Sequence, residues 1–220
     1  YLMKNNNRTL ARKLSSIRVL VDFLFRNEQM DKKISDGFNP IKLPKKQPDA
    51  IKKLAIDEVA KMLDAIETGE GLSKKQKQYW KKTKRRDKAI IMLFVTYGLR
   101  LNELQQLNIN SFSFKRGTFK IYRKRDKEVD MPINKSVKKA IKDYIELERN
   151  SEVKTDALFL SLQNKRLSKR SIRKLVKKYT AIGMEKSFEN GYSPHKLRAT
   201  AATSLLEHGF SIYDVKSLLD

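Results

Sequence analysis

The strongest constraint on this chain is a proline-rich stretch close to its N-terminal end. Between Gly37 and Lys53, three prolines occur among lysines, at positions 40, 44 and 48. Proline removes a backbone donor and clashes inside a helix, so this stretch forms neither a regular helix nor a central strand. We therefore predict that residues 37–53 are a linker between a short N-terminal piece, residues 1–36, and one larger domain, residues 54–220.

The N-terminal piece contains one amphipathic helix. From residue 8 to residue 28, apolar side chains recur at the spacing of one helical face: Leu10, Leu14, Ile17, Val21 and Leu24. Arg12, Ser15 and Arg18 lie mostly off this stripe, so we expect them on the polar face of the helix.

The larger domain is predicted to be mainly helical with a small β-sheet, an α+β fold. Alternating apolar residues predict a β-hairpin over residues 118–133. Gly98 suits the left-handed position after a helix, and Ser193 followed by Pro194 suits a helix start. The helices are expected over residues 56–67, 87–97, 100–107, 135–149, 168–180 and 193–207, and the lysine-rich residues 69–86 are assigned to no element.

Charge indicates the kind of partner. The chain has 49 Lys and Arg against 25 Asp and Glu, a net charge of +24 that repels itself unless a polyanion binds. Nucleic acid is the expected partner, with strongly salt-dependent binding. Without cysteine there is no disulfide framework and no cysteine zinc site. No apolar run approaches the ~20 residues of a membrane span, so we expect a cytoplasmic protein without a membrane partner.

Three segments carry candidate chemistry. Arg100 directly follows a glycine-ended helix, and a sharp turn there can direct its side chain into a cleft. A strongly basic turn, residues 122–128, forms the tip of the predicted hairpin. His195 and Arg198 are three residues apart in the first turn of a helix, where the helix terminus attracts phosphate. Taken singly, each segment also fits an ordinary structural role, such as an ion pair between Arg100 and Glu103.

Together these segments resemble the tyrosine recombinase (phage integrase) family, and within it the Xer branch. The family's motif T-G-L-R-x-x-E-L is similar to residues 96–104, with one additional tyrosine before the glycine. Its motif H-x-L-R-H-T-x-A-T is similar to residues 195–203. Its hairpin lysine falls at Lys124, at a separation from Arg100 typical of Xer proteins. The resemblance spans nearly the whole chain, and residues 1–36 would be the last part of the family's helical core-binding domain.

The chain departs from the family pattern in its hairpin and its second motif. Arg123 and Arg125 replace the glycines around the hairpin lysine, which leaves Lys127 as an alternative functional lysine. Ala199 replaces a histidine that is frequent but variable in the family.

The nucleophilic tyrosine of the family follows the second motif at a larger distance than these 220 residues reach. Tyr213 comes too early, and Tyr192 precedes the histidine. We therefore expect residues 54–220 to be a catalytic domain that stops before this tyrosine, and a chain that cannot cleave DNA as given.

The resemblance implies a site-specific DNA recombinase. It would break and rejoin DNA strands through a 3′-phosphotyrosyl intermediate and a Holliday junction, without cofactor or metal. The implied catalytic residues are Arg100, Lys124, His195 and Arg198, with Glu103 in support. The residues expected to grip DNA are Arg12, Ser15, Arg18, Lys169, Arg170 and Arg173.

The partner implied is a double-stranded recombination site, bound by a homo-oligomer, dimer to tetramer, when the protein is full length. Chromosome-dimer resolution in chromosome segregation and integration of a mobile element are both open as biological roles. The alternative from another class is a non-catalytic DNA-binding protein that keeps the recombinase fold. RNA binding ranks lower, because only 9% of the residues are aromatic and no stacking motif is present.

Overall fold

The computed structural model describes residues 7–30, 34, 52–123 and 127–219. The chain divides into two compact units, residues 1–50 and 51–220, and each is described by itself. Of the predicted linker, only Lys52 and Lys53 fall within the described residues.

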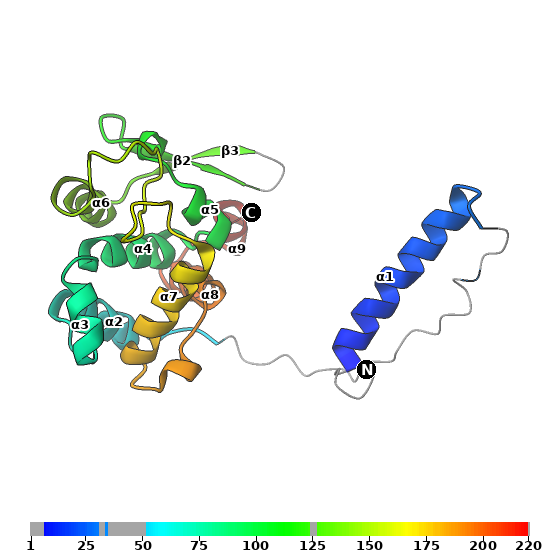
Figure 1. Cartoon of the computed structure of the whole chain (residues 1–220), viewed down its shortest axis with the longest axis horizontal. Coiled ribbons are helices and arrows are strands. Elements are labelled where there is room, and N and C mark those ends of the chain that lie inside the picture. The colour runs from blue at the N-terminus through cyan, green and yellow to red at the C-terminus, as the bar shows by residue number, and fades with distance from the viewer. Residues whose placement is uncertain (1–6, 31–33, 35–51, 124–126, 220) are drawn as a thin grey trace. The chain divides into compact units, whose positions relative to one another are not determined.

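The described part of the first unit consists mainly of one long helix, α1 (Asn7–Arg26), drawn in blue in Figure 1. The predicted amphipathic helix is thus confirmed. Val21 is buried, whereas Ile17, Leu20 and Phe23 remain exposed. Arg12 and Ser15 are exposed on this helix and Arg18 is half-buried.

The second unit is mainly helical, as predicted. Its helices are α2 (Ile56–Thr68), α3 (Lys74–Trp80), α4 (Lys84–Tyr97), α5 (Leu101–Gln106), α6 (Lys135–Leu147), α7 (Lys169–Gly183), α8 (Pro194–Glu207) and α9 (Ile212–Leu219), with short 3-10 turns η3 (Ile109–Ser111) and η5 (Phe188–Asn190). Helix α4 lies in the middle, packed against α2, α6 and α8, and α7 packs against α2 (Figure 1). Ile90, Phe94 and Tyr179 are fully buried at the centre of this packing.

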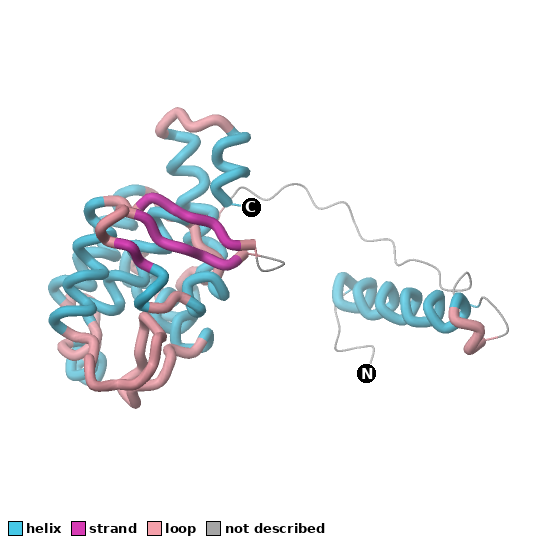
Figure 2. Tube along the Cα trace, turned by 90° about the horizontal axis from the view of Figure 1, so that it is seen from above, coloured by secondary structure: helices cyan, strands magenta, loops and turns pink. Residues whose placement is uncertain are grey.

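A three-stranded antiparallel sheet lies along one edge of this unit (Figure 2). It consists of β1 (Phe112–Ser113), β2 (Thr118–Tyr122) and β3 (Glu128–Pro132), in that order. Phe119 faces Met131 across β2 and β3, and both are buried, which confirms the predicted hairpin. Strand β1 has two residues, too few for an alternating pattern to be visible in the sequence.

Tyr97 anchors the base of the hairpin to the end of α4. Its hydroxyl donates to the Pro132 carbonyl at 2.9 Å and accepts the Asn134 backbone N–H at 2.6 Å. Its ring meets Phe119 edge-on at 4.9 Å. The additional tyrosine of the first motif is therefore a structural link between helix and sheet.

Helix α3 was not predicted, because it has only seven residues and its lysines and glutamines show no apolar periodicity. A capping box starts it: the Ser73 hydroxyl accepts the Gln76 backbone N–H, and the Gln76 side chain accepts the Ser73 N–H. Trp80 ends it, with its indole N–H donating to the Ile66 carbonyl at 2.7 Å. The following helix, α4, begins three residues earlier than predicted, at Lys84.

The fold class is the one predicted, mainly α with a small β-sheet. No helix in the described residues is both long and apolar enough to cross a membrane. The same residues contain no cluster of His, Asp and Glu suited to a metal ion.

Candidate active site

The first candidate arginine is placed by a tight turn after α4. Gly98 takes the left-handed conformation at the helix end, with φ 57°. A Cβ at this glycine would lie 2.9 Å from Leu219 Cδ2 and 3.3 Å from Ala201 Cβ, so α4, α8 and α9 meet closely here. The turn leaves Arg100 as the residue just before α5, with an extended backbone.

Glu103 accepts hydrogen bonds from both the backbone and the side chain of Arg100. One carboxylate oxygen accepts the Arg100 backbone N–H at 2.7 Å, and the other accepts its guanidinium at 3.0 Å. Glu103 is buried, with a side chain 4% exposed, whereas the Arg100 side chain is 42% exposed. A buried carboxylate thus orients a guanidinium whose outer face stays open to solvent.

The first turn of α8 supplies the second half of the site. Ser193 precedes the helix and Pro194 is its first residue, although the predicted side-chain cap from Ser193 does not form. His195 is exposed and Arg198 is half-buried. The expected placement of His195 and Arg198 on one helix face agrees with their joint presence in one pocket.

This pocket has a volume of about 240 Å³. It is lined by Leu99, Arg100, Leu101, Arg173, Ser193, Pro194, His195 and Arg198. Three guanidinium groups and an imidazole therefore converge from the turn before α5, from α7 and from α8, and the described lining contains no carboxylate. Such a pocket is suited to a phosphate or another tetrahedral anion, which guanidinium groups bind in a bidentate manner.

Arg198 also ties three elements together. Its guanidinium donates to the Gly98 carbonyl at 2.6 Å, and a second nitrogen donates to the Leu219 carbonyl at the end of α9. The same side chain therefore fixes the turn that carries Arg100 and the helix that follows α8.

The hairpin contacts helix α9 through Arg123. Its guanidinium donates to the Ser217 carbonyl at 3.2 Å and to the Leu218 carbonyl in the last turn of α9. Lys124, the predicted catalytic lysine, and Arg125 lie outside the described residues. Lys127 is described and exposed, so the choice between the two lysines remains a prediction.

Arg173 belongs to the pocket, although the sequence suggested only a DNA-gripping role for it. Lys169 and Arg170, the other two basic residues predicted on α7, are exposed on the preceding turn. No motif marked Arg173 as a pocket residue, because its position depends on how α7 packs beside α8 and the start of α5. Arg12, Ser15 and Arg18 lie on α1, in the other unit.

Comparison with known proteins identifies the family of this chain. Residues 52–220 match the model of the phage integrase family. The chain is 36% identical to the tyrosine recombinase XerC of Natranaerobius thermophilus, over 96% of this chain and 67% of that protein. It is 30% identical to the tyrosine recombinase XerD of Staphylococcus epidermidis, over 99% of this chain and 69% of that protein.

Among solved structures, the λ integrase dimer bound to a COC′ core site shares the fold. The TM-score is 0.63, with 15% sequence identity over 98% of this chain and 78% of that one.

The family match and the two Xer relatives place the chain in a class of enzymes that break and rejoin DNA at specific sites. The chain belongs to the phage integrase family, the family of the site-specific tyrosine recombinases.

Proposed function

We propose that Arg100, His195, Arg198 and Lys124 are the catalytic residues of this recombinase, and that Glu103 positions Arg100. The observation that carries the proposal is the convergence of Arg100, His195 and Arg198 in one pocket, although Arg100 and the α8 residues are far apart in the sequence. The proposal for Lys124 rests on the family resemblance and on its place in the hairpin between Arg123 and Lys127.

Each residue has a definite task in this proposal. A tyrosine hydroxyl attacks the phosphodiester, which gives a 3′-phosphotyrosyl bond and a free 5′-hydroxyl; the 5′-hydroxyl of the partner strand reverses the step. The covalent link conserves the bond energy between the two transfers. Negative charge accumulates on the non-bridging oxygens in the transition state, where Arg100 and Arg198 stabilise it. Lys124 protonates the leaving 5′-oxygen, and His195 holds a phosphate oxygen or assists proton transfer.

The domain organisation completes the proposal. Residues 1–36 form the end of a DNA-clamping piece, residues 37–53 a linker, and residues 54–220 the catalytic domain. Arg12, Ser15 and Arg18 on α1, together with Lys169 and Arg170 on α7, contact DNA phosphates, which position the protein rather than read sequence. The full-length protein assembles on a double-stranded recombination site as a dimer or tetramer and exchanges strands through a Holliday junction, in an Xer role or as a mobile-element integrase.

A trapping experiment tests the catalytic proposal. The protein expressed from its complete gene is first used to select its binding site from random duplex DNA, and is then incubated with that site carrying a nick. A covalent protein–DNA adduct that resists denaturation is expected. Arg198→Gln should slow adduct formation by about 10²–10³-fold, as removal of one anion-stabilising donor does. Lys115→Gln, in the turn between β1 and β2, is the control.

The two functional classes give different results. Sequence-specific binding without any adduct supports the non-catalytic alternative, a DNA-binding protein that keeps the fold. An adduct formed equally well by Arg198→Gln contradicts the assignment of the pocket.

A further inference from the structure

Helix α7 has a pocket on each of two flanks. Arg173 lines the candidate active site, whereas Ser171, Lys174 and Lys178 line a second, larger groove of about 680 Å³. Successive residues of a helix are rotated by about 100°, which directs Lys174 and Lys178 away from Arg173. The outer wall of the groove is formed by α3 and the start of α4, and η5 contributes Phe188.

The floor of the groove carries more positive than negative charge. Asp87 is the one carboxylate in its described lining, and it is 2% exposed. This carboxylate already accepts the Arg86 guanidinium at 2.8 Å and the Tyr179 hydroxyl at 3.2 Å, with the Lys178 ammonium at 3.6 Å. Lys174 has no acidic partner in the described part of the chain. Arg86, Lys174 and Lys178 therefore face a single carboxylate, and the excess charge suits an anion.

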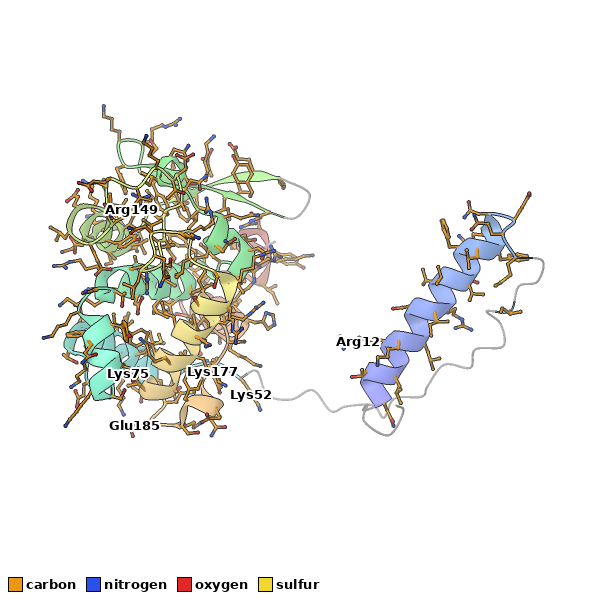
Figure 3. All side chains as sticks on the ribbon, in the orientation of Figure 1. Arg12, Lys52, Lys75, Arg149, Lys177 and Glu185 are labelled. Atoms are coloured by element: carbon orange, nitrogen blue, oxygen red, sulfur yellow. The ribbon has the colours of Figure 1, made fainter. Side chains whose placement is uncertain are left out.

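Further basic side chains lie on the two helices that border the groove, although α3 lines the groove itself with Gln76 and Tyr79. On α3 the exposed lysines are Lys74, Lys75 and Lys77. On α7, the Lys177 ammonium lies 4.9 Å from the centre of the Phe188 ring. Figure 3 labels Lys75 on α3 and Lys177 on α7, the two helices that border the groove. The positive surface thus continues from the groove onto the exposed face of α7, where Lys169 and Arg170 lie.

The dimensions of B-DNA relate the two flanks of α7 to the two strands of a duplex. A helix with its side chains is about 10–12 Å wide, and the major groove of B-DNA is about 12 Å wide, so a bound helix has one DNA backbone on each flank. If α7 lies in the major groove with the phosphate of one strand in the pocket beside Arg173, the complementary strand runs along the flank of Lys174 and Lys178.

We propose that the groove between α3 and α7 binds the phosphate backbone of the DNA strand complementary to the one in the active-site pocket. The inference rests on the proposed DNA-binding function and adds a second backbone site to it. Lys174 and Lys178 hold that backbone, and Arg86 contributes charge from the floor. Such contacts fix the rotation of α7 in the major groove, which presents the scissile phosphate to Arg100 and Arg198.

Salt dependence of binding tests the groove. The 220-residue chain is titrated into a labelled duplex of about 30 base pairs, roughly three helical turns, at several salt concentrations. Lys174→Gln is compared with the double variant Lys174→Gln and Lys178→Gln, and Lys115→Gln serves as a control with the same charge change as the single variant. The slope of log K against log salt should become less steep by about 0.9 for each phosphate that a variant no longer neutralises, and by about 1.8 in the double variant. The control should keep the wild-type slope.

A single-stranded probe of the same length tests the assignment to the complementary strand. Because that strand is absent, the groove variants should show the wild-type slope on this probe. An equal change of slope on both probes overturns the proposal, since the groove would then be a general polyanion surface. An unchanged slope on the duplex overturns it as well.

Failure of this inference is distinguishable from failure of the proposed function. If Arg173→Gln weakens duplex binding and the groove variants do not, only the groove is wrong. If the wild-type chain shows no salt-dependent duplex binding, the DNA-binding function itself is wrong. Lys178 lies beside a buried carboxylate, so thermal unfolding is measured for each variant. Lys174 is exposed, and Lys174→Gln alone carries the test if the double variant does not fold.

Discussion

The two flanks of α7 hold their positive charges in different ways. On the active-site flank, the guanidinium groups of Arg100 and Arg198 are oriented by one buried carboxylate and by backbone carbonyls, and the described pocket lining contains no acid. On the other flank, Arg86 and Lys178 surround the buried Asp87. Arg198 is held by carbonyls, which do not neutralise it, and Arg100 stays 42% exposed beside its buried carboxylate. Arg86 and Lys178 are only 12% and 20% exposed beside theirs, so their ion pairs contribute mainly to stability. The difference predicts that charge removal affects mainly activity on the first flank and mainly folding on the second.

The largest effect is expected from Asp87→Asn. Loss of this carboxylate removes the ion-pair partner of both Arg86 and Lys178 in partly buried positions, and breaking such a pair typically costs about 3–5 kcal/mol. Denaturant unfolding of the variant measures the loss. Asp143→Asn, which removes the partner of Lys139 on the exposed face of α6, is the matched control and should cost no more than about 0.5 kcal/mol. Equal losses in the two variants would show that Asp87 does not organise its flank.

A smaller loss is expected from Gly98→Ala, on the active-site flank. The left-handed backbone costs a non-glycine residue about 1–3 kcal/mol, and the new methyl group would meet Leu219 Cδ2 at 2.9 Å. Gly117→Ala is a close control, because Gly117 has φ 69° and no atom within 4 Å of its added Cβ. The difference between the two unfolding free energies isolates the close approach of α4 and α9. No difference would mean that Leu219 moves aside freely.

Glu103→Gln should lower stability by about 1–3 kcal/mol, the usual net value of a hydrogen bond to a charged partner. It should also slow adduct formation more than it weakens DNA binding, because Arg100 keeps its charge but loses its orientation. Unfolding and adduct kinetics, measured on the same preparation, separate the two effects. Glu128→Gln, which removes the exposed partner of Lys120, is the control and should leave both near wild type. A variant that only weakens binding would contradict the positioning role.

The smallest effect concerns pH. Burial lowers the pKa of Lys178 below its ordinary value of 10.5. The folded protein then loses this proton before the unfolded chain does, so the unfolded state binds more protons and stability rises with pH between the two pKa values. Lys178→Met should remove that rise. Unfolding is followed from about pH 7 to pH 9, below the pKa of about 10 at which unfolded tyrosines ionise. A rise that persists in the variant would exclude Lys178 as its source.

Local signals in the sequence predicted most of the second unit, and the family motifs predicted residues that share one pocket, whose catalytic roles stay a prediction. Glycine and proline positions and apolar periodicity predicted the hairpin and most helices, and two short motifs predicted that Arg100, His195 and Arg198 belong together. The residues missed are those whose neighbours are distant in the sequence. Arg173 enters the pocket only because α7 packs beside α8, and Arg123 reaches α9 across about 95 residues.

The predictions for the hairpin lysine, the linker and the domain boundaries stay untested. Lys124 and most of the linker lie outside the described residues. The domain boundaries and the roles of the site residues await the experiments above.

The hydrogen bonds of Tyr97 fix the base of the β2–β3 hairpin to the end of α4. The Tyr97 hydroxyl fixes the chain at Pro132 and Asn134, and Tyr97 itself directly precedes Gly98 in the sequence. From this fixed base, β3 extends over five residues, about 17 Å at 3.3 Å per residue. A tilt of about 10° at the base therefore moves the far end of the strand by roughly 3 Å, the length of one hydrogen bond. A displacement of α4 that tilts the base of the hairpin would therefore shift the far end of β3 by a distance that makes or breaks a hydrogen bond.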